Sequence, residues 1–137
     1  MKTHAFRIKR GQDLLLEIKK YVADHGLVAG TVVSGVGCVL CARVRDASGV
    51  KLRDIPEHME IISLMGTVSC NRTHLHIAFS KEDLSTIGGH LVEGCIVNTT
   101  AEVVLLELDG VEFQSEFDSE TGYNELVVVK KEINHKG

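Results

Sequence analysis

The chain has 137 residues, of which 44% are hydrophobic and 25% charged. This composition is typical of a folded globular protein and excludes a disordered or collagen-like chain, and the length predicts one domain over residues 1–137. The formal net charge of −4 disfavours general attraction to nucleic-acid phosphates. The charge is uneven, because residues 1–60 carry 10 basic and 7 acidic side chains whereas residues 61–137 carry 5 and 12. The negative net charge therefore does not exclude a local basic patch in the first half of the chain.

Nothing in the sequence suggests a membrane protein or a secreted one. No stretch reaches the roughly 18 apolar residues that a membrane-spanning helix needs. The first residues, MKTHAFRIKRGQ, lack the apolar segment of a signal peptide. Four cysteines in a chain of this length do not form a disulfide framework. We therefore expect a cytoplasmic protein with reduced thiols and no membrane partner.

The N-terminal part predicts a strand followed by a helix. Apolar residues recur at helical spacing from Leu14 to Val22. Asp13 is a suitable N-cap residue, and Gly26 can adopt the left-handed conformation that often ends a helix. The sequence therefore predicts one long helix near the N-terminus.

Almost all of the remaining chain has strand character. Runs rich in Val, Ile and Leu alternate with turn signals such as Ser48-Gly49 and the segment SETGYN. Asp109-Gly110 predicts a hairpin between the runs before and after it, and residues 87–108 have the pattern of one long strand region. Together these patterns predict an α+β fold in which a curved, mostly antiparallel sheet of about seven or eight strands accompanies the helix.

Three of the seven histidines occupy positions that suggest a metal site. His74 and His76 flank Leu75, and residues i and i+2 of a strand point to the same face, about 6.6 Å apart. His90 follows Gly88-Gly89, where two missing side chains would allow a close approach to a neighbouring strand. Three histidines around one divalent ion, with a fourth position open, are typical of catalytic or exchangeable zinc sites. The alternative is that the two strand histidines are simply half-exposed.

Other polar groups allow further interpretations. Glu93 and Glu102 are the carboxylates nearest to the histidines in sequence, and a carboxylate beside a bound ion could act as a general base. A metal-dependent enzyme for a small molecule is therefore an alternative to a binding module. The remaining histidines are expected to be exposed to solvent; these are His4, His25, His58 and His135.

Two further groups of residues are weaker candidates for a functional site. Basic residues gather around one predicted turn, where they could contact phosphate or DNA or could form an ordinary solvated strand face; they are Arg43, Arg45, Lys51 and Arg53.

Cys38 and Cys41 have the C-x-x-C spacing, but inside a predicted strand this spacing sends the two thiols to opposite faces, so we expect structural cysteines.

Three segments together resemble the plants-and-prokaryotes-conserved (PPC) domain. These are MEIISLMGTVS (residues 59–69), HLHIAFS (residues 74–80) and GGHLVEGCIVNTTAEVVL (residues 88–105). The GTVVSGVG segment and the closing DSETGYNELVVV are also similar, so the resemblance covers nearly the whole chain. The sequence lacks the R-G-R-P hook that precedes this domain in plant nuclear proteins, since residues 9–12 read KRGQ.

The resemblance implies a curved, mainly antiparallel sheet with one long helix, assembled as a homotrimer. It also implies that His74, His76 and His90 bind a metal ion, with zinc as the expected cofactor. DNA is a possible partner, because prokaryotic members often carry a DNA-binding label. The expected function is thus a trimeric, zinc-containing binding or regulatory module for an unidentified small-molecule or protein ligand.

Overall fold

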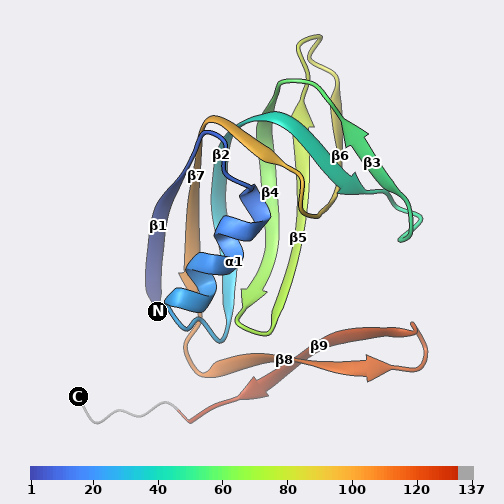
Figure 1. Cartoon of the computed structure of the whole chain (residues 1–137). Coiled ribbons are helices and arrows are strands. Elements are labelled where there is room, and N and C mark those ends of the chain that lie inside the picture. The colour runs from blue at the N-terminus through green and yellow to red at the C-terminus, as the bar shows by residue number, and fades with distance from the viewer. Residues whose placement is uncertain (133–137) are drawn as a thin grey trace.

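Strand-forming residues dominate the chain. The computed structural model describes residues 1–132, which build two antiparallel sheets beside one helix (Figure 1). The strands are β1 (Lys2–Lys9), β2 (Gly30–Arg45), β3 (Leu52–Ile55), β4 (Met59–Ser69), β5 (Arg72–Ser80), β6 (Thr86–Leu91), β7 (Ile96–Glu107), β8 (Val111–Asp118) and β9 (Tyr123–Lys130). The helix is α1 (Leu14–Asp24). Every strand pair is antiparallel, as predicted.

The larger sheet has seven strands and curls on itself. Its order is β1-β7-β2-β4-β5-β6, and β3 pairs with β2 outside this path. The end of β2 also pairs with β6. The last strand in this order, β6, therefore lies beside β2 as well as beside β5. β2 is 16 residues long, and its register with β7 shifts at three places. Such irregularities bend a strand and increase its twist, so the predicted curvature is confirmed.

The hydrophobic core lies between the sheet and α1, which crosses one face of the sheet (Figure 1). Leu14, Ile18 and Val22 form the buried stripe of the helix. They join a cluster made almost entirely of Val, Leu and Ile from the strands, with Phe79 as its largest fully buried side chain. Aliphatic side chains of this kind fill the core at high density, so the fold needs no tryptophan.

The helix begins where the sequence predicts but is short. The Asp13 side chain accepts a hydrogen bond from the backbone N–H of Leu16, which caps the N-terminus. The helix then runs for only 11 residues, because the chain turns at His25 and Gly26 takes a φ of +61°. The prediction of a long helix was therefore wrong. No helix within the described residues is long and apolar enough to cross a membrane.

The strand count of nine exceeds the prediction of seven or eight. Residues 87–108 form two strands rather than one, because the chain turns before Ile96 and Gly94 takes a φ of +115° there. The short strand β3 pairs with the end of β2. The division between β6 and β7 depends on pairing with strands distant in sequence, which local patterns do not reveal, whereas β3 forms a hairpin with β2, the strand directly before it in the chain.

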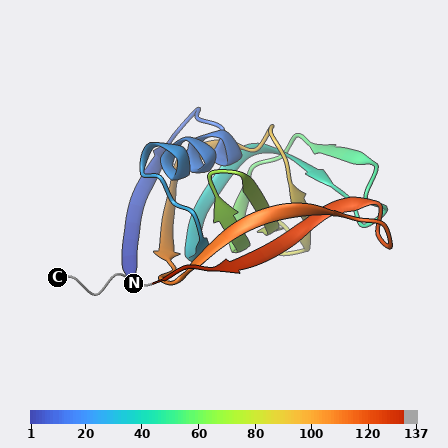
Figure 2. The same ribbon diagram turned by 90° about the horizontal axis from the view of Figure 1, so that it is seen from below.

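Asp109 and Gly110 do turn the chain, but they do not form the predicted hairpin. β7 pairs with β1 and β2, whereas β8 pairs only with β9. The turn therefore leads out of the large sheet into a separate two-stranded hairpin. Seen from below, this hairpin runs along the ends of the large sheet, on the side away from α1 (Figure 2).

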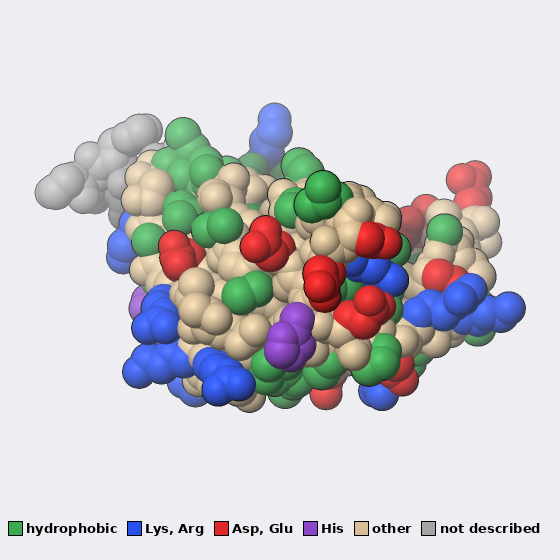
Figure 3. Space-filling model, turned by 90° about the horizontal axis from the view of Figure 1, so that it is seen from above, with side chains coloured by type: hydrophobic (Ala, Val, Ile, Leu, Met, Phe, Trp, Pro, Cys, Tyr) green, Lys and Arg blue, Asp and Glu red, His purple; other side chains and the backbone are tan. Residues whose placement is uncertain are grey.

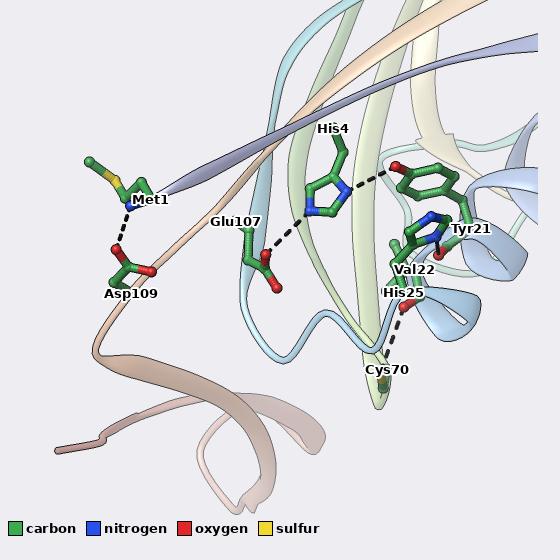
Figure 4. A network of polar contacts seen from close by, with 8 residues as sticks. All are labelled: Met1, His4, Tyr21, Val22, His25, Cys70, Glu107 and Asp109. Atoms are coloured by element: carbon green, nitrogen blue, oxygen red, sulfur yellow. Dashed lines mark hydrogen bonds and ion pairs between the residues drawn. The ribbon is translucent and has the colours of Figure 1, made fainter. Parts of the chain in front are cut away.

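A polar network ties the first strand to the helix and to β7 (Figure 4). His4 has only 5% exposure, so the expectation that it is exposed to solvent was wrong. Its Nδ1 lies 2.9 Å from the hydroxyl of Tyr21, and its Nε2 lies 3.2 Å from a carboxylate oxygen of Glu107. The ring of Tyr21 is stacked between Phe6 and His25. Hydrogen bonds on both ring nitrogens explain why a histidine can be buried here.

Gly66 illustrates how closely β4 and β5 approach each other. It has a φ of +146°, and a Cβ atom there would lie 1.9 Å from the carbonyl oxygen of His74. We expect Gly66→Ala to lower the free energy of unfolding by about 2–4 kcal/mol, because the two strands must separate or the backbone must change. Urea denaturation followed by circular dichroism would measure this loss.

The matched control is Gly122→Asn in the β8–β9 turn. Gly122 also has a positive φ, of +79°, but a Cβ there would contact nothing within 4 Å, and asparagine tolerates this conformation. We expect a loss of less than about 1 kcal/mol. Equal losses for both variants would contradict the close-approach explanation.

Candidate functional site

The structure brings His74, His76 and His90 together on one face of the curved sheet. His76 and His90 are directly paired across β5 and β6, and His74 precedes His76 by two residues on β5. The ring centroids are 5.0 to 5.6 Å apart. One ligating atom from each ring lies within 4.8 Å of the other two. The alternating residues of β5, among them Leu75 and Ile77, point into the core, so the histidines occupy the opposite face.

Two glycines allow His90 to occupy this place. A Cβ atom at Gly88 would lie 2.3 Å from the carbonyl oxygen of Ile77, and one at Gly89 would lie 2.6 Å from that of Arg45. Any larger residue would therefore push β6 away from β5 or from the end of β2. The close approach suggested by the Gly-Gly-His pattern is thus confirmed.

The surroundings of His74 and His90 favour the neutral form of their imidazole rings. Partial burial, followed by the positive charge of Arg45, lowers the pKa of His90 from 6.5 to about 4. Partial burial and then Arg72 also lower the pKa of His74. A neutral imidazole has a free lone pair, which a metal ligand requires.

The cluster suits a divalent metal ion. Three nitrogens that each lie about 2.0–2.1 Å from one zinc ion are roughly 3.4 Å apart, and His74 and His76 are exposed, so their rings are free to turn toward a shared ion. The Nδ1 atom of His90 is buried and has no hydrogen-bond partner in the described chain. A buried ring nitrogen without a partner is unfavourable, and a bound ion would give this ring an interaction that the protein does not supply.

The two carboxylates suggested by the sequence lie in different places. Glu93 lines a shallow hollow together with His90. Glu102 lies on β7, beside Arg7 of β1, and accepts a hydrogen bond from Thr100. It lines none of the hollows that contain the histidines.

Arg72 and Glu125 lie near the histidines and were not among the residues that the sequence suggested, whereas Arg45 was, as a member of the basic cluster that could contact phosphate. Arg45 is paired with His90 across β2 and β6, and Glu125 of β9 partly offsets the larger effects that lower the pKa of His74. Arg72 could also have been found from the sequence, since it lies two residues before His74 on the same strand face. The other two reach the site through strand pairing and through the position of the hairpin.

Two of the four residues in the predicted basic cluster are neutralised by ion pairs. Arg43 binds the carboxylate of Asp54, and Arg53 binds that of Asp46, so the cluster offers less free positive charge than the sequence suggests. On the face of the molecule seen from above, acidic side chains lie over the middle with one basic group among them, and the other basic side chains lie toward the edges (Figure 3).

The two cysteines of the C-x-x-C pattern face different partners. The thiol of Cys38 donates to the carbonyl oxygen of Asn98 at 2.9 Å, and the thiol of Cys41 donates to that of Gly94 at 3.8 Å. Both are free thiols. Their separate contacts fit the expectation of structural cysteines.

Sequence comparisons place the chain near a known domain. The model of the Plants and Prokaryotes Conserved (PCC) domain matches residues 1–109. A protein from Synechococcus sp. (strain JA-3-3Ab) named Bifunctional protein GlmU is 35% identical over 130 residues, which are 95% of this chain but 21% of that protein. The chain thus spans about a fifth of the length of the curated relatives it matches.

Solved structures share the fold. A hypothetical protein from Salmonella cholerae-suis has a TM-score of 0.92 at 29% identity, with 95% of this chain and 94% of that chain covered. A metal-containing protein from Archaeoglobus fulgidus has a TM-score of 0.77 at 27% identity, with 93% and 94% covered. A candidate DNA-binding protein from Bacteroides thetaiotaomicron has a TM-score of 0.82 at 21% identity, with 91% of each chain covered, and this likeness concerns the fold alone.

The low pKa of His90 predicts a pH-dependent stability of the metal-free protein. Between pH 6.5 and about 4 the unfolded chain binds a proton at His90 that the folded chain excludes, so the free energy of unfolding falls as the pH falls through this window. We expect His90→Gln to flatten this dependence. Urea denaturation in the presence of a chelator, at several pH values, would measure it.

His58→Gln serves as the control, because His58 is exposed in the loop before β4. It should leave the slope of stability against pH unchanged. An identical slope for wild type and His90→Gln would show that His90 is not excluded from protonation in the folded state.

Proposed function

This chain belongs to the Plants and Prokaryotes Conserved (PCC) domain family, and we propose that it is a zinc-containing, trimeric binding or regulatory module. The observation that carries the proposal is the convergence of three histidines from two adjacent strands, with their ligating atoms within 4.8 Å of one another. The metal-containing protein from Archaeoglobus fulgidus, 27% identical, supports a metal in this fold. Imidazole ligands suit zinc among the common divalent ions.

In this proposal His74, His76 and His90 hold the ion by their ring nitrogens. A zinc ion bound by three protein ligands supplies Lewis acidity and an open coordination position for a ligand. The sheet contributes rigidity, since two of the ligands share β5 and the third is locked against it by strand pairing. Ligands placed on paired strands are held more precisely than ligands on loops.

Exposed apolar residues support assembly into a trimer. Val36 and Ile62 are 53% and 54% exposed, and each adjoins in sequence one member of the pair Gly37–Ile61 between β2 and β4. The β8–β9 hairpin adds exposed Phe117, Leu126 and Val128, which share one face of the hairpin. Exposed apolar side chains of this kind are typical of interfaces between subunits.

The thiols support residence in the cytoplasm as part of the same proposal. All four cysteines are free, and Cys95 is buried in the core. Burial raises the pKa of the Cys95 thiol to about 11, which keeps it protonated and unreactive. Free thiols of this kind suit a reducing compartment.

A metal-dependent enzyme is the second candidate. An open hollow of about 600 Å³ borders His76 and His90, which is a volume suited to a small organic molecule. Glu93 is the sequence-predicted carboxylate that remains near a histidine of the cluster, so it is the candidate for moving a proton. Glu102 lies among residues of β1 and β7, away from the histidines of the same chain.

Metal content tests the main proposal. The protein purified without a chelator should contain about one zinc ion per chain, and His76→Ala or His90→Ala should lose most of it, because two imidazoles bind zinc far more weakly than three. Elemental analysis by plasma mass spectrometry is the measurement. His58→Ala should retain the wild-type content. Unchanged zinc in both site variants would rule out this cluster as the metal site.

The oligomeric state tests the trimer separately. The wild type should scatter light as a particle of three chains of 15.0 kDa each. The double variant Val36→Glu/Ile62→Glu should shift to one chain, because charges placed in an apolar interface are costly to bury. Leu84→Glu, at a position that is 82% exposed in the β5–β6 turn, should remain trimeric. A wild-type monomer at micromolar concentration would contradict the proposal.

A further inference from the structure

Two arginines beside the three histidines have no acidic partner. Arg43 and Arg53 each bind an aspartate, but Arg45 and Arg72 form no ion pair within residues 1–132. Arginines close to a site that attracts cations are unexpected, because their charge opposes metal binding. Indeed, Arg45 lowers the pKa of His90 and Arg72 lowers that of His74.

Strand pairing points both arginines toward the site. Arg45 is paired with His90, His90 with His76, and His76 with Met65, so the four residues form one row across β2, β6, β5 and β4. Residues in such a row project from the same face of the sheet. Arg72 precedes His74 by two residues on β5 and shares its face. The two guanidinium groups therefore flank the histidines on two sides.

Arg45 also has an unsatisfied donor. Its Nε atom is buried and has no hydrogen-bond partner in the described part of the protein. A buried donor attached to a charged group is expensive to leave unpaired, and such groups in folded proteins usually have an acceptor. The acceptor that is missing here must carry oxygen atoms and, for the best pairing with guanidinium, a negative charge.

Two hollows that border this row of residues leave room for such an acceptor. One hollow of about 600 Å³ is lined by Arg45, His76 and His90, with the small residues Ala78 and Gly88 in its lining. A second of about 600 Å³ is lined by Arg45, Arg72, His74 and His90. The β8–β9 hairpin borders this second hollow with Ser115, Tyr123, Asn124 and Glu125. Both volumes are in the range of small-molecule sites.

The charges around these hollows favour an anion. Asp46 borders the first hollow, but it is already paired with Arg53. Glu125 at the second hollow and Glu93 beside His90 are the other nearby carboxylates. A divalent ion on the histidines would add two positive charges to those of Arg45 and Arg72. The combined charge would then exceed that of the carboxylates that face the site.

We propose that Arg45 and Arg72 bind an oxyanion, the carboxylate or phosphate group of a small molecule, next to the metal held by the three histidines. This inference rests on the proposed metal site and adds the chemical class of its ligand. The anion supplies the acceptor that Arg45 lacks and offsets the positive charge of the arginines and the ion. The adjoining hollows would hold the rest of the ligand.

The test uses the full chain loaded with Co²⁺, whose visible absorption reports changes near the metal. Titration with inorganic phosphate should change the spectrum saturably. Arg45→Gln should raise the half-saturating concentration at least about tenfold, because a charge-assisted hydrogen bond is lost. Arg10→Gln, which removes the same charge from the turn between β1 and α1, should match the wild type. A parallel titration with acetate distinguishes a carboxylate ligand from a phosphate.

A second measurement separates anion binding from a structural role. In phosphate-free buffer, Arg45→Gln should bind Co²⁺ as tightly as the wild type or more tightly, because a repelling charge has been removed. A residue with only a structural role would weaken both Co²⁺ and phosphate when replaced.

Three results would overturn the inference. One is a Co²⁺ spectrum that responds to neither anion, and another is an equal response in wild type and Arg45→Gln; both leave the metal proposal standing. Failure of the wild type to bind Co²⁺ would overturn the metal proposal and this inference with it.

Discussion

The close approach of three strands at β6 is the constraint on which the candidate site depends. Gly88 and Gly89 let β6 lie against the backbones of β5 and β2 at distances that no side chain would allow. That contact brings His90 opposite His76 and Arg45 opposite His90. It also curls the sheet, because β6 pairs both with β5 and with the end of β2. The closure of the sheet at β6 and the geometry of the site thus have the same cause, in addition to the register shifts of β2 that bend the sheet.

The charges around the histidines act in two opposite ways. Partial burial and then the charges of Arg45 and Arg72 lower the pKa of His90 and His74, which suits metal ligation. The same arginines would repel a cation, and they form no ion pair within residues 1–132. In our proposal, an anionic ligand beside the ion offsets the excess positive charge and supplies the acceptor that the Nε atom of Arg45 lacks in the described chain.

The buried His4 shows that histidines in this chain serve two different purposes. His4 has hydrogen-bond partners on both nitrogens and connects β1 to α1 and β7. His90 is also partly buried, yet one of its nitrogens has no partner in the described chain. A satisfied histidine stabilises the fold, whereas an unsatisfied one in a cluster indicates a ligand that the protein alone does not provide.

The sequence by itself determined the elements whose patterns are local. The capped helix start at Asp13, the antiparallel strands, the turns at Gly49 and Gly122, and the pairing of His74 with His76 on one strand face all follow from spacing along the chain. The metal candidates were also visible there, because a strand repeats every two residues. The end of the helix was visible as well, because Gly26 takes the left-handed conformation that the sequence suggested, with a φ of +61°.

Only the tertiary structure decided what depends on pairing between distant segments. The division between β6 and β7 depends on pairing with strands elsewhere in the chain, and β8 leaves the large sheet to pair with β9. The roles of Arg45 and Glu125 arise in the same way, because the register across β2 and β6 and the position of the hairpin bring them to the histidines. Strand register is a property of two segments at once, and a pattern read along one segment does not contain it.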